Sequence, residues 1–230
     1  MLTVNNSVNF RAVPVAKVKP LAEYGGKEIT LFKLNESDEK FLQKMLNNIN
    51  LRKLLPKETK NVNYDKWKGF IKSAASRVKK QNVVLAVQEK RPCGIMAFRN
   101  ENESSSYLSF IATWPTKPYR KARFAGQALI RELFQYNVDT NRKNIELFAA
   151  SESINGKRCI DFYKKLGFDK SPIYADMLEL KDADFSRKSA QVENYFKYER
   201  ITDGENVNLS KTLRRNLENP FEKLINLFRL

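Results

Sequence analysis

The chain has 230 residues, of which 42% are hydrophobic and 11% aromatic, and its formal net charge is +16 at pH 7. This length and composition suffice for a substantial core and exclude a chain that is disordered throughout. The sequence has no histidine, which excludes Ser–His–Asp and Cys–His catalysis and most zinc sites, and Cys93 and Cys159 stand in no metal-ligand spacing.

The basic excess points to an anionic partner, for which nucleic acid, anionic lipid and a phosphate-rich cofactor all qualify. Plain solubility with a basic bias is the alternative. No apolar run approaches the roughly 20 residues of a membrane span, and the first residues lack the apolar core of a signal peptide. We therefore expect no transmembrane segment, a cytoplasmic location and no bound metal.

The first part of the chain divides into an arm and a series of regular elements. Residues 1–26 contain Pro14, Pro20 and the Gly25-Gly26 pair with little periodicity, which predicts an irregular arm or one loosely attached strand. Asn35, Ser37 or Asp38 is expected to cap the first helix. The hydrophobic periodicity predicts strands at 27–34, 82–89, 94–100 and 107–113 and helices over about 38–49 and 65–80.

The second part predicts a crossover and a helical tail. Elements are expected at about 124–138 (helix), 144–151 (strand), 156–168 (helix, ended by Gly167) and 174–180 (strand). The order β-α-α-β-β-β-α-β-α-β implies an α/β fold with a mixed sheet and helices on both faces. Residues 184–230 are expected to form a helical extension. Its last segment is amphipathic and packs on the domain itself or mediates self-association, a partner contact or a membrane contact.

The segment "KPYRKARFAGQAL" (117–129) joins a predicted strand to a predicted helix. Helix N-termini leave backbone N–H groups unpaired, and small residues there let those groups reach a phosphate. An ordinary basic, solvated helix start explains the same residues. This segment alone therefore leaves both interpretations open.

A second segment, "FYKKLGF" (162–168), follows one helix and one strand later. Together the two segments resemble the GCN5-related N-acetyltransferase (GNAT) family, in which a strand leads into Arg/Gln-x-x-Gly-x-Gly/Ala and a later helix ends in Tyr-x-Lys-x-Gly-Phe. The resemblance covers roughly residues 27–181. We therefore divide the chain into an N-terminal arm (1–26), a GNAT-like acetyltransferase domain (27–183) and a C-terminal extension (184–230).

The resemblance implies that acetyl-CoA binds between the strands at 107–113 and 144–151. Its pantetheine would run along the strand edge at Ile111, Ala112 and Thr113. Tyr163 would protonate the departing thiolate, for which a phenol with a pKa of about 10 is a plausible acid; a packed aromatic residue is the alternative. The remaining residues that would bind the cofactor are Arg120, Arg123, Phe124, Ala125, Gly126, Gln127, Ala128 and Asn155.

Three features depart from the family pattern. Arg123 stands where the first glycine is usual if Arg120 begins the motif; a second register runs from Arg123 to Gly126 and Ala128. We adopt the first register, which keeps the Tyr-Arg pair common in the family. Gly156 replaces a frequent Asn, for which the neighbouring Asn155 could substitute.

The third departure concerns the general base. The strand at 107–113 has no Glu, so Glu103, Glu146 and Glu152 are the candidates, or a neutral amine attacks without a base. We predict an N-acetyltransferase that moves an acetyl group from acetyl-CoA to a primary amine of a protein or small molecule. The alternative is a weak or inactive GNAT-like module that binds CoA, RNA or a membrane through its basic surface.

Overall fold

One nine-stranded sheet runs through the described part of the chain, with the strand order β7-β8-β6-β5-β4-β3-β2-β1-β9. The computed structural model describes residues 12–48, 64–114, 122–149, 156–172, 174, 176–209 and 213. The strands are β1 (Val13–Pro20), β2 (Ile29–Leu34), β3 (Asn82–Gln88), β4 (Arg91–Asn100), β5 (Ser105–Thr113), β6 (Asn144–Phe148), β7 (Asp169–Lys170), β8 (Met177–Leu180) and β9 (Phe196–Arg200). Only β5 and β6 pair in parallel; the other paired strands of the sheet are antiparallel.

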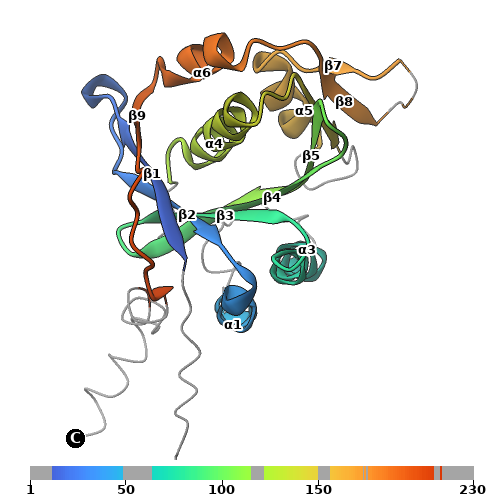
Figure 1. Ribbon diagram of the computed structural model, residues 1–230. Coiled ribbons are helices and arrows are strands. Elements are labelled where there is room, and N and C mark those ends of the chain that lie inside the picture. Colours follow the sequence, from blue (N-terminus) through green and yellow to red (C-terminus); the bar gives the residue numbers. More distant parts are fainter. Residues whose placement is uncertain are drawn as a thin grey trace, which may run out of the picture.

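Helices cover both faces of this sheet (Figure 1). The helices are α1 (Glu39–Asn48), α3 (Tyr64–Arg77), α4 (Ala125–Asp139), α5 (Gly156–Lys165) and α6 (Phe185–Glu193), with short 3-10 turns η1 (Ala22–Tyr24) and η2 (Glu36–Asp38). In Figure 1, α1 and α3 lie on one face, and α4, α5 and α6 on the other. The predicted fold class, a mixed sheet with helices on both faces, is confirmed.

Two buried clusters sandwich the sheet. The α4-side cluster includes Val84, Ala86, Leu129, Ile130, Phe134 and Tyr163. The α1/α3-side cluster includes Leu42, Met45, Ile71, Val83, Leu85 and Val87. The β3 side chains alternate between the two clusters, so this strand, buried on both faces, has the continuous apolar run "VVLAV" (83–87).

Local signals place α1 where the sequence predicts it. The Asn35 side chain accepts a hydrogen bond of 2.9 Å from the Ser37 amide, and Asp38 accepts one of 3.0 Å from the Asn35 amide. This reciprocal arrangement is a capping box, which satisfies amides that would otherwise lack partners. Asn35, one of the three predicted caps, therefore caps the 3-10 turn η2, which leads directly into α1.

The two ends of the chain each contribute a strand, and the sequence analysis allows for only one of them. Residues 13–20 form β1, the strand alternative for the arm, which pairs with β2 on one side and with β9 on the other. Residues 196–200 form β9 instead of a helix. In both segments the exposure of successive side chains alternates only partly, so the hydrophobic pattern does not indicate a strand clearly. Pairing with a neighbouring strand selects the extended conformation. The boundaries at residues 26 and 183 therefore cut through one sheet.

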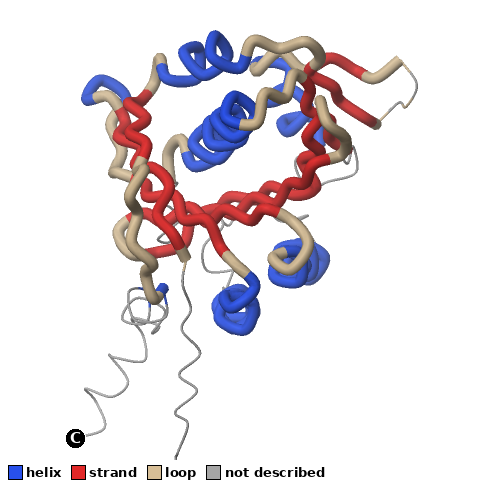
Figure 2. The backbone as a smooth tube through the Cα atoms, in the orientation of Figure 1, coloured by secondary structure: helices blue, strands red, loops and turns tan. Residues whose placement is uncertain are grey.

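The sheet curves around α4, and α6 closes the open side of the curve (Figure 2). Leu209 and Leu213, from the predicted amphipathic tail, are fully buried in the α1/α3-side cluster. These two residues therefore pack on the domain itself, while the rest of the tail lies outside the described residues. None of the described helices combines the length and apolarity needed to cross a bilayer.

Candidate functional site

The parallel strands β5 and β6 stay together over only part of their length. Residues 105–108 of β5 pair with residues 144–147 of β6, whereas residues 110–113 pair with β4 alone among the described strands. A bulge at Ser109 marks the divergence, because Ala97 pairs with Phe110 and Phe98 pairs with Leu108. A bulge bends and twists a strand. The second half of β5 therefore presents an open edge to the space between the two strands.

The ladder between β4 and β5 decides which backbone groups face that edge. The Trp114 amide donates a 2.9 Å hydrogen bond to the Cys93 carbonyl. Antiparallel pairs alternate between bonded and non-bonded, so Ala112 bonds to Ile95 while Ile111 and Thr113 direct their N–H and C=O groups away from β4. Of the three predicted pantetheine contacts, Ile111 and Thr113 thus offer backbone partners, and Ala112 does not.

The N-terminus of α4 lies at the same end of β5. The Ala128 amide donates the first bond of the helix, 2.8 Å to the Phe124 carbonyl, and Phe124 provides no side-chain cap. The amides of Ala125, Gly126 and Gln127 precede that bond and have no acceptor within the helix. With the helix dipole, these three N–H groups favour an anion. Of the predicted pyrophosphate residues, Ala125, Gly126 and Gln127 therefore lie in the uncapped first turn of α4, whereas the amide of Ala128 is used within the helix.

Phe124 holds this turn in an unusual conformation. Its φ of 65° lies in the left-handed region, which a bulky residue rarely adopts. The ring is held by neighbouring aromatic rings, with centroids 5.9 Å from Tyr195, 6.0 Å from Phe196 and 6.2 Å from Tyr24. The sequence analysis missed this aromatic clamp because Tyr24 and Tyr195 come from segments assigned to the arm and the extension.

The same geometry bears on the two possible registers of the phosphate motif. Arg123 is not among the residues with positive φ, so its position does not require the glycine that the family usually has. Its guanidinium donates to the Tyr24 carbonyl, which ties the start of α4 to η1. Gly126 lies inside the first turn of the helix rather than in the loop before it. The left-handed conformation falls on Phe124, one residue after Arg123.

Gly126 stands where three elements converge. A Cβ atom on Gly126 would lie 3.8 Å from Phe162 Cζ on α5 and 3.9 Å from Thr113 Cγ2 on β5. Gly94 on β4 is tighter still, since its Cβ would lie 3.1 Å from both Leu129 Cδ1 and Thr113 Cγ2. The structure thus brings together the predicted strand-edge, phosphate-loop and helix residues that the sequence separates by up to 50 positions.

The end of α5 positions Tyr163. The Gly167 amide donates 2.9 Å to the Lys164 carbonyl, and the Phe168 amide donates 3.1 Å to the Tyr163 carbonyl. With φ of 88° at Gly167, these bonds form a Schellman motif, which normally brings the residues at its two ends into contact. The Tyr163 and Phe168 rings indeed meet edge-on, with centroids 5.5 Å apart. The "YKKLGF" spacing therefore sets the direction of the Tyr163 ring.

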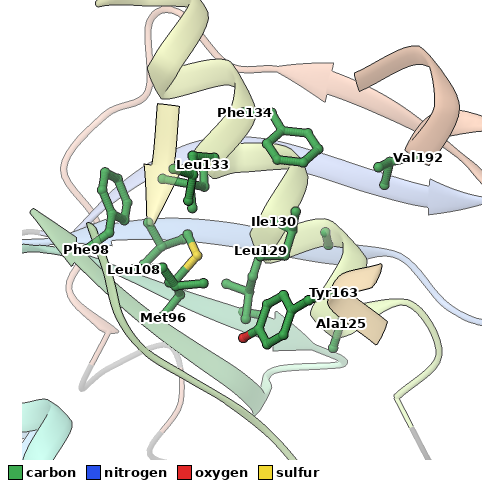
Figure 3. Packing of buried hydrophobic residues seen from close by; sticks show 14 of the residues in the cluster. Met96, Phe98, Leu108, Ala125, Leu129, Ile130, Leu133, Phe134, Tyr163 and Val192 are labelled. Atoms are coloured by element: carbon green, nitrogen blue, oxygen red, sulfur yellow. The ribbon is translucent and has the colours of Figure 1, made fainter. Parts of the chain in front are cut away.

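Tyr163 lies in the α4-side cluster and is 6% exposed. Figure 3 shows its ring beside Leu129 and Ala125, on the first turns of α4. The Tyr163 ring therefore packs against the first turns of α4, the helix that carries the uncapped amides.

The candidate bases are less well placed. Glu103 lies in the β4–β5 turn, before β5 begins, whereas the open edge is at the other end of that strand. Glu146 pairs with Tyr107 in the closed half of β5, and it alternates with Ile145 and Leu147, which face the α4-side cluster. Glu152, like Arg120 and Asn155, falls outside the described residues.

Cys93, on β4, is a poor candidate nucleophile. Burial raises the pKa of the Cys93 thiol to about 12, and its Sγ lies 3.4 Å from the Ala86 carbonyl. The thiol therefore stays protonated at neutral pH and is a poor nucleophile. The described residues contain no cluster of three or more potential metal-binding Asp, Glu or Cys side chains.

No known family model matches the sequence, and no curated protein does either. Among solved structures, the chain is similar to the PaiA N-acetyltransferase of Thermoplasma acidophilum in complex with coenzyme A, with 15% identity and a TM-score of 0.45 over 66% of this chain and 98% of that one. It is also similar to the spermidine/spermine N-acetyltransferase SpeG of Vibrio cholerae, with 15% identity and a TM-score of 0.44 over 70% of this chain and 98% of that one. A third similar structure is Tetrahymena GCN5, with 17% identity and a TM-score of 0.41 over 63% of this chain and 88% of that one.

Proposed function

We propose that this protein is an acyl-CoA-dependent N-acyltransferase, which moves an acetyl group from acetyl-CoA to a primary amine of a protein or small molecule. The observation that carries the proposal is the juxtaposition of an open strand edge on β5 with the uncapped first turn of α4. A strand edge binds an amide-containing chain, and a bare helix N-terminus binds a pyrophosphate. CoA contains both, joined to each other.

The chain's own groups divide the work between binding and proton transfer. The amides of Ala125, Gly126 and Gln127 would hold the pyrophosphate, and the backbone of Ile111 and Thr113 would align the pantetheine. Such alignment alone lowers the activation barrier, because two reactants that are held in place have already lost the translational and rotational entropy that an encounter in solution would cost. The thioester carbonyl would be polarised by backbone N–H groups at the open edge.

The transfer itself needs few side chains. The amine nitrogen forms a bond to the thioester carbon, the carbon–sulfur bond breaks, and the electron pair leaves on sulfur. Tyr163 would donate its proton to that thiolate and regain one from solvent, while the amine nitrogen loses its proton to water or a base. The sequence 109–113 contains no carboxylate, which fits attack by an amine that is already neutral.

Binding tests the proposal first. We expect millimolar acetyl-CoA to raise the melting temperature of the wild-type protein, because a ligand that binds only the folded state stabilises it. Gly126→Val should abolish the shift, since the added methyl groups would enter the space between Thr113 and Phe162. Gly69→Val is the matched control: no atom outside its own helix lies within 4 Å of the added Cβ, so the shift should remain. A wild-type protein that does not respond to acetyl-CoA contradicts the proposal.

Turnover separates an enzyme from an inactive binding module. Release of CoA can be followed with 5,5′-dithiobis(2-nitrobenzoate) against a panel of amines. Tyr163→Phe should lower kcat by roughly 100-fold or more with little change in acetyl-CoA affinity, because general acid–base catalysis typically contributes about 100- to 10,000-fold. Equal activity in this variant would remove Tyr163 from the mechanism. Binding without turnover on any amine would favour the module that binds CoA without reacting.

A further inference from the structure

A pocket of about 370 Å³ lies between α4, α5 and α6. This volume is within the range of about 300–1,000 Å³ found for ligand pockets. Helix α6 lies beyond residue 181, where the resemblance to the acetyltransferase family ends, and it contributes one wall. The residues that matter for its chemistry are Gln127, Phe162, Lys165, Lys188, Gln191 and Tyr195.

Gln127 connects this pocket to the candidate site. Its backbone amide is one of the three uncapped amides at the start of α4, and the residue also lines the pocket. Phe162, on α5, makes a second connection, because it lines the pocket and also lies next to Gly126 in the first turn of α4. A molecule whose phosphate rests on that turn therefore has the pocket next to it.

The side chains of the pocket suit a phosphorylated nucleoside. Lys165 and Lys188 supply two ammonium groups, Gln127 and Gln191 supply amides, and none of the described residues that line it is acidic. Phe162 and Tyr195 provide aromatic surface for a flat ring. Purines stack on aromatic side chains, and phosphates attract ammonium groups, so both parts of a nucleotide find partners.

Lys188 is held in place to make such a contact. It is half-buried, and its Nζ donates a 3.3 Å hydrogen bond to the Leu166 carbonyl at the end of α5. An ammonium group has three donors, so this bond leaves two for a ligand. Fixing the lysine in advance reduces the entropy that its ordering would otherwise cost on binding.

We propose that α6 completes the cofactor site, with the pocket binding the nucleotide end of CoA and with Lys165 and Lys188 contacting its ribose 3′-phosphate. This inference rests on the function proposed above. It assigns a role in recognition to the C-terminal extension, and it accounts for part of the chain's basic excess. The protein should therefore prefer CoA to 3′-dephospho-CoA, which lacks only that phosphate.

The test measures the affinity of four proteins for these two ligands by calorimetry. The wild type should bind CoA about tenfold more tightly than 3′-dephospho-CoA, the size of one charge-assisted contact. Lys188→Gln keeps a donor for the Leu166 carbonyl; it should lose several-fold in CoA affinity and keep its 3′-dephospho-CoA affinity. Lys165→Ala should behave in the same way. Arg187→Gln, also on α6 but outside the pocket lining, is the matched control and should bind both ligands as the wild type does.

The outcomes separate this inference from the proposed function. If the wild type binds neither ligand, the proposed function fails and this inference fails with it. If it binds both ligands within twofold, the function stands and the phosphate contact is wrong. Equal losses for both ligands in Lys188→Gln, or the same losses in Arg187→Gln, would also overturn the assignment. Because Lys165→Ala does not touch the bond to Leu166, misfolding of the Lys188 variant would still leave a test.

Discussion

The first turn of α4 and its last turns contact the rest of the molecule by different means. At Ala125, Gly126 and Gln127 the side chains are small or polar, the amides are uncapped, and the neighbours are a strand edge and α5. From Arg131 onward, charged side chains bind the C-terminal segment. The end proposed to bind the cofactor therefore uses the backbone, and the opposite end uses charge.

The charged end is a network between α4 and the segment α6–β9. Arg131 Nε lies 2.5 Å from Glu193 Oε1, and its guanidinium carbon lies 4.0 Å from the centre of the Tyr198 ring. The Tyr198 hydroxyl donates a 2.6 Å hydrogen bond to Glu132. These contacts hold α6 and β9 on the helix, and Tyr195, between them, stacks on Phe124 at the other end. The C-terminal segment therefore supports the uncapped first turn of α4, although it lies outside the two motifs from which that turn was predicted.

A substitution at the charged end of α4 should have the largest effect on the free energy of unfolding. Arg131→Met removes the ion pair with Glu193 and the contact with Tyr198 from a side chain that is 9% exposed. Loss of one partner of a buried pair costs about 3–5 kcal/mol; Glu193 is 33% exposed, so we expect about 2 kcal/mol lower free energy of unfolding. Urea denaturation measures this. Arg187→Met, on the exposed side of α6, should change stability by about 0.5 kcal/mol or less. A loss there as large as that of Arg131→Met would mean that the contacts of Arg131 contribute no more to stability than an exposed arginine does.

In the aromatic clamp at the first turn of α4, glycine at position 124 should destabilise the protein less than alanine does. Phe124→Ala loses the ring contacts and keeps the left-handed backbone, which costs about 2 kcal/mol for a half-buried ring. Phe124→Gly loses the same contacts and relieves the backbone, so it should be about 1 kcal/mol more stable than the alanine variant. Thermal unfolding of both variants checks the order. If alanine is the milder change, the left-handed conformation is not what constrains this position.

The contribution of Glu132 to stability should depend on pH. Burial raises the pKa of Glu132, although the bond from Tyr198 opposes the shift. A raised folded-state pKa adds stability below the ordinary value of about 4.5, and this contribution is lost as pH rises through the raised pKa. Glu132→Gln keeps an acceptor for Tyr198 and does not titrate. Its free energy of unfolding should therefore improve relative to the wild type as pH rises from 4 to 7. A constant difference would mean that folding does not shift the pKa of this carboxyl.

Much of the fold could be predicted from local pattern. The Asn35–Asp38 cap, the apolar run of β3 and the Gly167 helix end all follow from side chains that act within a few residues of each other. The edge at Ile111 and Thr113 was predicted by resemblance, but its register depends on the bulge at Ser109. A bulge reflects a mismatch between two strands, which neither strand's own sequence specifies.

The sequence by itself determined the order of the elements from β2 to β8 apart from the two-residue β7, the uncapped helix start and the helix ending that directs Tyr163, because these depend on short-range backbone geometry. Only the tertiary structure decided that residues 13–20 and 196–200 join one sheet, that Arg123 bonds to the Tyr24 carbonyl, and that α6 walls a pocket beside Gln127. Each of these joins segments about 60 to 180 positions apart. Such contacts form only when folding has paid the entropy of closing long loops, and no local periodicity records which partners will meet.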